Sequence, residues 1–320
     1  MNVLDLVTSC QTIGISGHEN PDGDCVGSCM GMALVLRKKL PDARIDVFLE
    51  KLPPELEKNI PGTETICHTF ETDVDRYDAF ILLDTTPDRA GEAGAMFERA
   101  GVKINIDHHI SNPGCGDHNY VDGQCGSACE LVYDCIPEED LDAQIAQALY
   151  VGIVTDTGMF RFPSTQQSTM EKAGKLISYG FDFPTIVREV YFERTYLQMK
   201  VLGEVFRRAK RSANGLLIIS VMDHDTLTAL GASREDLDGA SEQMVQTAGV
   251  DCAIFAHEDE KGLWRCSMRS NKFINVSEIA VKIGGGGHIR ASGCTVRTDD
   301  FRNVLHLIEE MVHAQIQKAE

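Results

Sequence analysis

Three short apolar segments in the first half of the chain each lead into a histidine or an aspartate. The segments are Thr12–Ser16, Ala79–Leu83 and Val102–Ile106, and the polar residues that follow them are His18, Asp84 and Asp107. Segments with helical composition, such as Ser28–Lys39, lie between or after them. Strands that alternate with helices at this spacing predict an α/β fold, in which helices cover both faces of a mostly parallel sheet.

The polar residues after these segments are expected to lie close together. In an open parallel sheet, ligands bind beyond the carboxyl ends of the strands, so these side chains should share one edge. Further acidic and imidazole groups extend two of these clusters or follow an apolar helical segment: Asp22, Asp24, His108, His109 and Asp156. An aspartate after a strand is often only a helix cap. Four clusters of carboxylate and imidazole together predict a metal centre.

The ligand types indicate which metal to expect. Carboxylates with one or two imidazoles suit Mn²⁺, with Mg²⁺ as the other possibility. These clusters offer no cysteine thiolate that would favour zinc. A pair of ions needs a bridging carboxylate. Asp84 is the best candidate, because its strand is the most apolar and should be central. Two ions about 3.5–4 Å apart would activate water and stabilise the leaving oxygen of a phosphoryl group.

Charge and cysteine usage narrow the class of protein. The 49 acidic residues outnumber the 30 basic ones, for a net charge of −19. This charge disfavours tracking along long nucleic acids and permits small anionic substrates held by metal ions. The 11 scattered cysteines are typical of reduced thiols. There is no signal-like N-terminus and no apolar run of the ~20 residues that a membrane span needs. We expect a cytoplasmic protein without a membrane anchor.

The second half follows a different pattern. Residues from about 168 to 210 are mostly helical in composition, and a series of apolar strands then begins, with a hairpin pattern at Cys252–His257 and Leu263–Arg269. We expect a catalytic domain over residues 1–185, a helical connector over 186–212 and a smaller α/β domain over 213–320.

A glycine run marks the second domain. Gly284–Gly287 precede His288, and such a run allows close backbone approach to a ligand and N–H donation to phosphate. Arg269 ends a predicted strand and can make bidentate contacts with a phosphate. Arg161 could reach a substrate phosphate or form a surface ion pair. His257 matches no motif and is expected to be a structural or surface residue.

The acidic and histidine clusters resemble motifs I to IV of the DHH phosphoesterase superfamily. The resemblance implies a phosphoesterase that uses two metal ions, usually Mn²⁺. It implies one ion held by His18, Asp22 and Asp84. It implies the other held by Asp24, Asp84, His108 and Asp156. Asp107 would orient the imidazoles, and His109 would contact the scissile phosphate or act as a general acid.

The glycine run and the arginine segment resemble the DHHA1 domain, which accompanies DHH domains and binds substrate. The substrate-binding residues that this resemblance implies are Arg269, Ser270, Gly285, Gly286, Gly287 and His288. A DHH and a DHHA1 domain together resemble enzymes that hydrolyse very short RNA and remove the 3′-phosphate of adenosine 3′,5′-bisphosphate (pAp). The expected partners are therefore short RNA or DNA oligonucleotides or mononucleotide bisphosphates, and the family resemblance implies a homodimer. Two alternatives stay open: a cyclic dinucleotide phosphodiesterase, and a non-catalytic metal-dependent nucleotide-binding protein.

Overall fold

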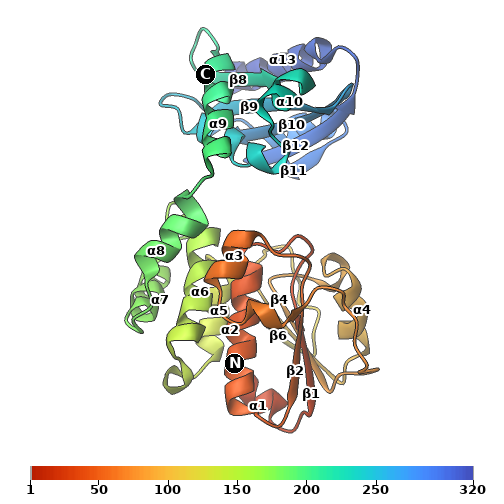
Figure 1. Cartoon of the computed structure of the whole chain (residues 1–320), viewed down its shortest axis with the longest axis vertical. Helices are drawn as coiled ribbons and strands as arrows, with labels where there is room; N and C mark the ends of the chain where they lie inside the picture. The colour runs from red at the N-terminus through yellow and green to blue at the C-terminus, as the bar shows by residue number, and fades with distance from the viewer. Residues whose placement is uncertain (1, 320) are drawn as a thin grey trace. The chain divides into compact units, whose positions relative to one another are not determined.

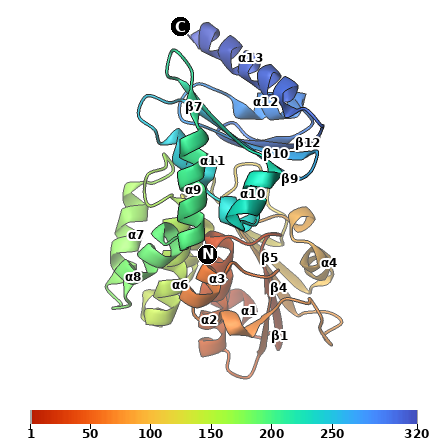
Figure 2. The ribbon, with the colours of Figure 1, turned by 45° about the horizontal axis from the view of Figure 1, so that its top comes forward.

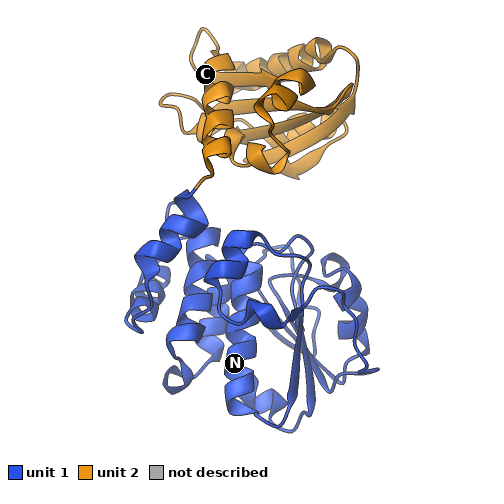
Figure 3. Cartoon of the chain, in the orientation of Figure 1, with its two compact units in different colours: residues 1–193 blue, residues 194–320 orange. Residues whose placement is uncertain are grey.

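The computed structural model describes residues 2–319 and has two compact units, which divide between Glu193 and Arg194 (Figure 3). Residues 186–212, the expected connector, are split between them. A π-helical turn, Arg188–Phe192, ends unit 1, whereas α9 (Tyr196–Arg208) packs into unit 2 through Val201 and Val205. Within residues 2–319, no helix has the length and apolar character that crossing a bilayer requires.

A six-stranded parallel sheet forms the centre of unit 1, as the alternating pattern predicts. Its strand order is β3-β2-β1-β4-β5-β6. The fully buried strand β4 lies between β1 and β5, in agreement with its apolar sequence. The order reverses between β1 and β4, and a crevice for ligands is expected at the carboxyl ends of strands on either side of such a point. The strand bounds are β1 Thr12–Ser16, β2 Arg44–Phe48, β3 Ile66–Cys67, β4 Ala79–Leu83, β5 Val102–Asp107 and β6 His118–Val121.

Helices cover both faces of this sheet (Figure 1). On one face, α2, α5 and α6 contribute to the large core that includes Met30, Leu131 and Leu149, and on the other α4 packs Phe97 against Phe80. The helix bounds of unit 1 are α1 Val3–Val7, α2 Gly23–Lys39, α3 Pro54–Asn59, α4 Glu92–Arg99, α5 Ala128–Cys135, α6 Ala143–Asp156, α7 Gln167–Ile177 and α8 Phe183–Val187.

Helix α2 begins at Gly23, five residues before Ser28, where the sequence predicted its start. Asp22 caps it by accepting hydrogen bonds from the backbone N–H groups of Asp24 and Cys25, both at 3.1 Å. The glycines of this segment lower helix propensity, which conceals the first turns in the sequence. Gly27 is required by packing, since an added Cβ would lie 2.6 Å from the Ala148 carbonyl oxygen of α6. The two helices approach closely along this ridge, and that contact sets the position of Asp24.

Unit 2 is built on a mixed six-stranded sheet in the order β11-β12-β10-β9-β8-β7, which is antiparallel except for the pair β8 and β9. The predicted hairpin is the pair β9 and β10. One face packs against α12 and α13, and the other against α9, α10 and α11 (Figure 2). The remaining bounds are β7 Lys210–Arg211, β8 Leu217–Met222, α10 His224–Leu230, α11 Ala240–Val245, β9 Cys252–Glu260, β10 Leu263–Ser270, α12 Val276–Lys282, β11 Gly286–His288, β12 Ala291–Arg297 and α13 Phe301–Ala319.

Candidate metal centre

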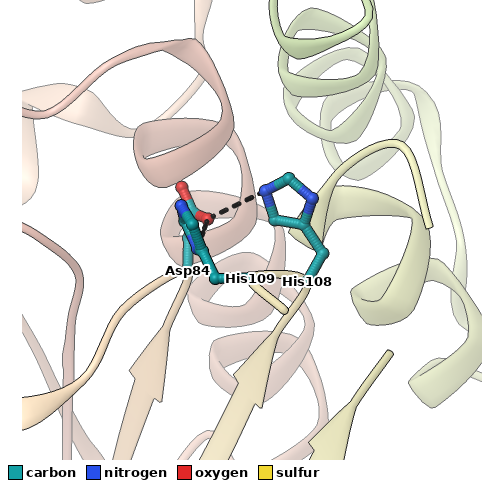
Figure 4. A group of neighbouring side chains, drawn as sticks. All are labelled: Asp84, His108 and His109. Carbon is teal, nitrogen blue, oxygen red and sulfur yellow. Dashed lines mark ion pairs between the residues drawn. The ribbon is translucent and has the colours of Figure 1, made fainter. Parts of the chain in front are cut away.

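Asp84 lies at the middle of the polar cluster beyond β4. Its carboxylate is 2% exposed, and its Oδ1 lies 3.4 Å from Nε2 of His108 and 3.5 Å from Nδ1 of His109 (Figure 4). Its Oδ2 lies 3.4 Å from Nε2 of His18. Oδ1 is buried without a hydrogen-bond partner among the described residues. A buried carboxylate oxygen in this state is costly unless a cation compensates it.

The loop after β1 brings His18 and Asp22 to the same place. Nε2 of His18 lies 3.6 Å from Oδ1 of Asp22. Nδ1 of His18 is 2.8 Å from the Glu19 carbonyl oxygen, so it carries the proton and donates to that oxygen. Nε2 is therefore the ring nitrogen that faces the two carboxylates, and it is the nitrogen that would bind a metal ion once deprotonated.

His108 joins a second group on the other side of Asp84. Its Nε2 lies 3.4 Å from Asp156 Oδ2 and 3.8 Å from Asp24 Oδ2. Its Nδ1 lies 3.3 Å from the Cys125 carbonyl oxygen, which again leaves Nε2 free for the cluster. Asp156 reaches the group from the last residue of α6.

Asp24 is fixed by the start of another helix. Its Oδ2 accepts a 2.6 Å hydrogen bond from the Ala128 N–H, and its Oδ1 accepts one of 2.9 Å from the Cys129 N–H. These are the first two residues of α5, where backbone N–H groups lack helical partners and the helix dipole favours a negative charge. These two hydrogen bonds fix the position of the carboxylate. One of the donors, Ala128, is 104 residues away in the sequence.

The electrostatics show that the cluster suits cations. Burial raises the pKa of the Asp24 carboxyl well above its usual value, and the neighbouring Asp84 and Asp156 charges raise it further. Burial also raises the pKa of Asp156 to about 6. For His18, burial would lower the pKa, but the hydrogen bonds to Asp22 and Asp84 outweigh it and raise the pKa to about 12. The carboxyl groups of Asp24 and Asp156 therefore tend to retain protons unless a further positive charge balances them.

The structure groups the predicted ligands into three sets whose ligand atoms lie within 4.8 Å of one another. The sets are His18, Asp22 and Asp84; Asp24, His108 and Asp156; and Asp84, His108 and His109. Every residue predicted to bind metal is therefore in the cluster. The donors are carboxylate oxygens and imidazole nitrogens, which fit a hard or borderline divalent cation.

Asp107 and His109 form a pair beside these sets. His109 donates through Nδ1 to Asp107 Oδ1 at 2.7 Å, and its backbone N–H donates to the same oxygen at 3.1 Å. The hydrogen bond to Asp107 raises the pKa of His109. Asp107 itself is 1% exposed, whereas the His109 side chain is 34% exposed. With Nδ1 held, Nε2 of His109 is the nitrogen available to a substrate.

Two buried asparagines that the motif analysis did not identify support this pair. Asn112 donates to Asp107 Oδ2 at 2.5 Å and to Asn105 Oδ1 at 2.9 Å. Asn105 in turn donates to the carbonyl oxygens of Leu82 and Thr85, which flank Asp84. Asp84 has φ = +57°, a left-handed conformation uncommon for residues with a side chain. The asparagine in the middle of the apolar segment 102–106 was the available sequence signal.

The predicted substrate residues of unit 2 are distributed differently. Arg269, at the end of β10, lines a pocket together with Gly284 and Gly285. Ser270 is buried and donates its hydroxyl to the Ile274 carbonyl oxygen at 2.6 Å. Gly286, Gly287 and His288 form the exposed edge strand β11.

The glycines at 284 and 285 have a structural role in addition to lining the pocket. The N–H groups of Gly284 and Gly285 donate to the Val281 and Ala280 carbonyl oxygens at the end of α12, so they do not face a phosphate as the sequence suggested. An added Cβ at Gly285 would lie 2.2 Å from the Gly293 carbonyl oxygen. A glycine at this position therefore allows the close approach to β12.

Arg161 lies in a loop whose residues Gly158, Met159 and Phe160 all have positive φ. Its guanidinium donates to the Gly158 carbonyl oxygen at 2.7 Å and to the Tyr191 hydroxyl, and it lies over the Tyr191 ring. These contacts fix the side chain within unit 1.

Each of the two units matches a known domain family. Residues 12–153 match the DHH family, N-terminal domain, and residues 214–314 match the DHHA1 domain. The chain is 28% identical to the bifunctional oligoribonuclease and PAP phosphatase NrnA of Thermus thermophilus, over 96% of this chain and 91% of that protein. It is 28% identical to the protein of the same name from Bacillus subtilis, over 93% of each.

Solved structures show the same fold. An exopolyphosphatase-related protein from Bacteroides fragilis superposes with a TM-score of 0.87 at 22% identity, covering 98% of this chain and 94% of that one. The exonuclease RecJ bound to manganese superposes with a TM-score of 0.52 at 13% identity, over 98% and 92% of the two chains. The chain therefore contains a DHH N-terminal domain followed by a DHHA1 domain.

Proposed function

We propose that this protein is a phosphoesterase that depends on two divalent cations, Mn²⁺ in preference to Mg²⁺. Its substrates would be short oligonucleotides, such as linear dinucleotides, and the 3′-phosphate of pAp. The observation that carries the proposal is Asp84, whose buried, unpartnered Oδ1 faces two imidazoles while its Oδ2 faces a third. The names of the relatives that match over almost the whole chain support the substrate class.

Two of the three ligand sets have no residue in common, and each would hold one cation. One site would use His18 and Asp22, the other Asp24, His108 and Asp156, with Asp84 serving both. Bound there, the cations would lower the pKa of a water molecule and neutralise charge on the phosphoryl oxygens.

The protein's own groups supply orientation and a proton. Asp107 holds Nδ1 of His109, which keeps the ring in one orientation and favours its protonated form. Nε2–H can then donate to a phosphoryl oxygen or to the leaving oxygen. The contacts of Asp24 with α5 and of Asp22 with α2 fix two carboxylates before any ligand arrives, so little reorganisation is needed on binding.

The test uses the full chain, stripped with EDTA and reloaded with Mn²⁺. pAp, a linear dinucleotide and a cyclic dinucleotide are offered separately, and the products are identified by chromatography. We expect hydrolysis of the first two. Product from the cyclic substrate alone would favour the cyclic dinucleotide phosphodiesterase, and no product from any would favour a non-catalytic binding protein.

Asp84→Asn is the decisive variant, because asparagine tolerates a positive φ and has nearly the same shape. Activity should fall at least about 100-fold, since several kcal/mol of cation stabilisation is lost. The rise in melting temperature on adding Mn²⁺ should disappear as well. Asp88→Asn, at an exposed position in the following turn, is the matched control and should behave as wild type. Full activity in Asp84→Asn would contradict the shared role of Asp84. Light scattering would test the expected homodimer.

A further inference from the structure

The loop between β1 and α2, residues 17–22, carries two of the ligands of one proposed cation site. His18 and Asp22 belong to the same ligand set, which Asp84 completes. Nε2 of His18 lies 3.6 Å from Oδ1 of Asp22. The separation of these two atoms depends on the backbone of the residues between them. A group that fixes this backbone therefore also fixes the cation site.

Asn20, midway between the two ligands, has a strained backbone. Its φ is +55°, in the left-handed region that residues with a side chain seldom adopt. It also precedes Pro21, and a residue before proline prefers an extended conformation. Strain of this kind persists only where the surrounding structure holds the residue in place. The loop therefore needs a partner outside itself to keep this shape.

The Glu50 carboxylate supplies that partner. Glu50 lies two residues beyond the end of β2, and its Oε2 accepts a hydrogen bond of 2.7 Å from the Asn20 N–H. Strand β2 pairs in parallel with β1, so the segments that follow the two strands lie side by side. A hydrogen bond to a carboxylate is charge-assisted and is roughly twice as strong as one between neutral groups. Glu50 thus holds the loop at its strained residue.

The main chain on both sides of this hydrogen bond is anchored. On the loop side, the Glu19 N–H donates to the Arg89 carbonyl oxygen at 2.9 Å. On the strand side, Nδ1 of His68 lies 2.9 Å from the carbonyl oxygen of Leu49 and 3.1 Å from that of Glu50. Because these contacts hold both segments, the hydrogen bond from the loop to Glu50 ties the position of the ligands to the end of β2.

We propose that Glu50 is a positioning residue for the cation site that includes His18 and Asp22. By holding the Asn20 N–H, it keeps the ligands on either side of that residue at the separation that a shared cation requires. This inference rests on the proposed function and adds to it a residue outside the predicted motifs. Glu50 is in none of the ligand sets found among residues 2–319, so it acts through the loop and not on the cation itself.

The test measures Mn²⁺ binding to the metal-free full chain by isothermal titration calorimetry, without substrate. Wild type should bind two ions per chain. In Glu50→Ala, the affinity for one of the two ions should fall at least about tenfold, because removing groups that orient metal ligands typically costs about 10–100-fold. Glu50→Gln keeps an oxygen that can accept from the Asn20 N–H, so both affinities should stay within about threefold of wild type.

Asp117→Ala is the matched control. Oδ2 of Asp117 accepts a hydrogen bond of 2.9 Å from the Lys103 N–H, which is the same kind of contact as that of Glu50. Lys103 is the second residue of β5, so this contact lies at the amino end of the strand, at the opposite edge of the sheet from the cation sites. Asp117→Ala should therefore keep both Mn²⁺ affinities.

Asp22→Asn identifies the cation site on which Glu50 acts. This variant removes a ligand of the set that contains His18. Adding Glu50→Ala to it should change the remaining Mn²⁺ affinity by less than about twofold, because both changes act on one site. A further tenfold loss would assign the effect of Glu50 to the other ion and refute the assignment.

The remaining outcomes separate this inference from the proposed function. Unchanged affinities in Glu50→Ala would overturn the positioning role. An equal loss in Glu50→Gln would show that charge is responsible and not the hydrogen bond, and an equal loss in Asp117→Ala would show a general effect on the fold. In each of these cases wild type still binds two ions, so the proposed function stands. Binding of fewer than two ions by wild type would instead overturn the two-cation centre, and the role of Glu50 with it.

Discussion

Asn112→Ala is the change that best tests how the Asp107–His109 pair is held. Asn112 is 6% exposed and takes part in three hydrogen bonds of good length. It donates to the Asp107 carboxylate at 2.5 Å and to Asn105 at 2.9 Å, and it accepts from the Gly114 N–H at 2.8 Å. Alanine removes all three and leaves buried partners without a replacement.

The size of the effect follows from these contacts. A hydrogen bond to a charged group contributes about 1.5–3 kcal/mol and a neutral one about 0.5–1.5 kcal/mol, so the loss of one charged and two neutral bonds should lower the free energy of unfolding by at least about 2.5 kcal/mol. For a domain of this size, each kcal/mol corresponds to about 2–4 °C, which predicts a melting temperature lower by at least about 5 °C. Differential scanning calorimetry measures the shift, and the transition that Mn²⁺ raises identifies unit 1.

Asn119→Ala is the matched control. Asn119 is exposed and exchanges hydrogen bonds of 2.8 Å with the Gly116 backbone, so its loss should cost less than about 1 kcal/mol. In Asn112→Ala, kcat should fall about 10–100-fold because His109 is no longer fixed. The Mn²⁺-induced stabilisation should persist, since Asp107 is absent from the ligand sets. A melting temperature equal to that of Asn119→Ala would refute the supporting role of Asn112.

Three further changes test packing and pH dependence. An added Cβ at Gly152 would lie 2.2 Å from Cys129 Sγ, so Gly152→Ala should cost about 1–3 kcal/mol, and Cys129→Ala should restore part of it in a double-mutant cycle of urea titrations. Gly174, within α7, has no neighbour within 4 Å, so Gly174→Ala should raise stability by about 0.5–1 kcal/mol; a loss would disprove the open space. Asp78 accepts backbone hydrogen bonds from Gln11 and Thr12, which hold its pKa below the usual 3.8. A lowered pKa stabilises the fold above pH 3.8 and loses this effect as the pH falls through the lowered pKa, so Asp78→Asn should cost about 1 kcal/mol at pH 7 and progressively less in acid. A deficit independent of pH would contradict this assignment.

Much of the fold was predictable because it depends on local periodicity. The buried strand β4 is apolar at all of its positions, and its central place follows from that. The start of α2 was not predictable, because its glycines suppress the helical pattern for the sake of contact with α6, a segment more than 100 residues later. Edge strand β11 was also missed, because glycine carries no side-chain pattern.

The sequence alone predicted which ligand types gather in the candidate metal centre, because carboxylates and imidazoles follow apolar strands and parallel strands end at one edge of a sheet. It also predicted the two domain families, through motifs whose spacing is local. Only the tertiary structure decided how these groups are held: Asp24 by the N–H groups of α5, and Asp107 by Asn112 and Asn105. It alone placed the Glu50 carboxylate against the loop that carries His18 and Asp22. The reason is physical, because hydrogen bonds and burial depend on which distant segments pack together, and one chain's local pattern does not specify its long-range neighbours.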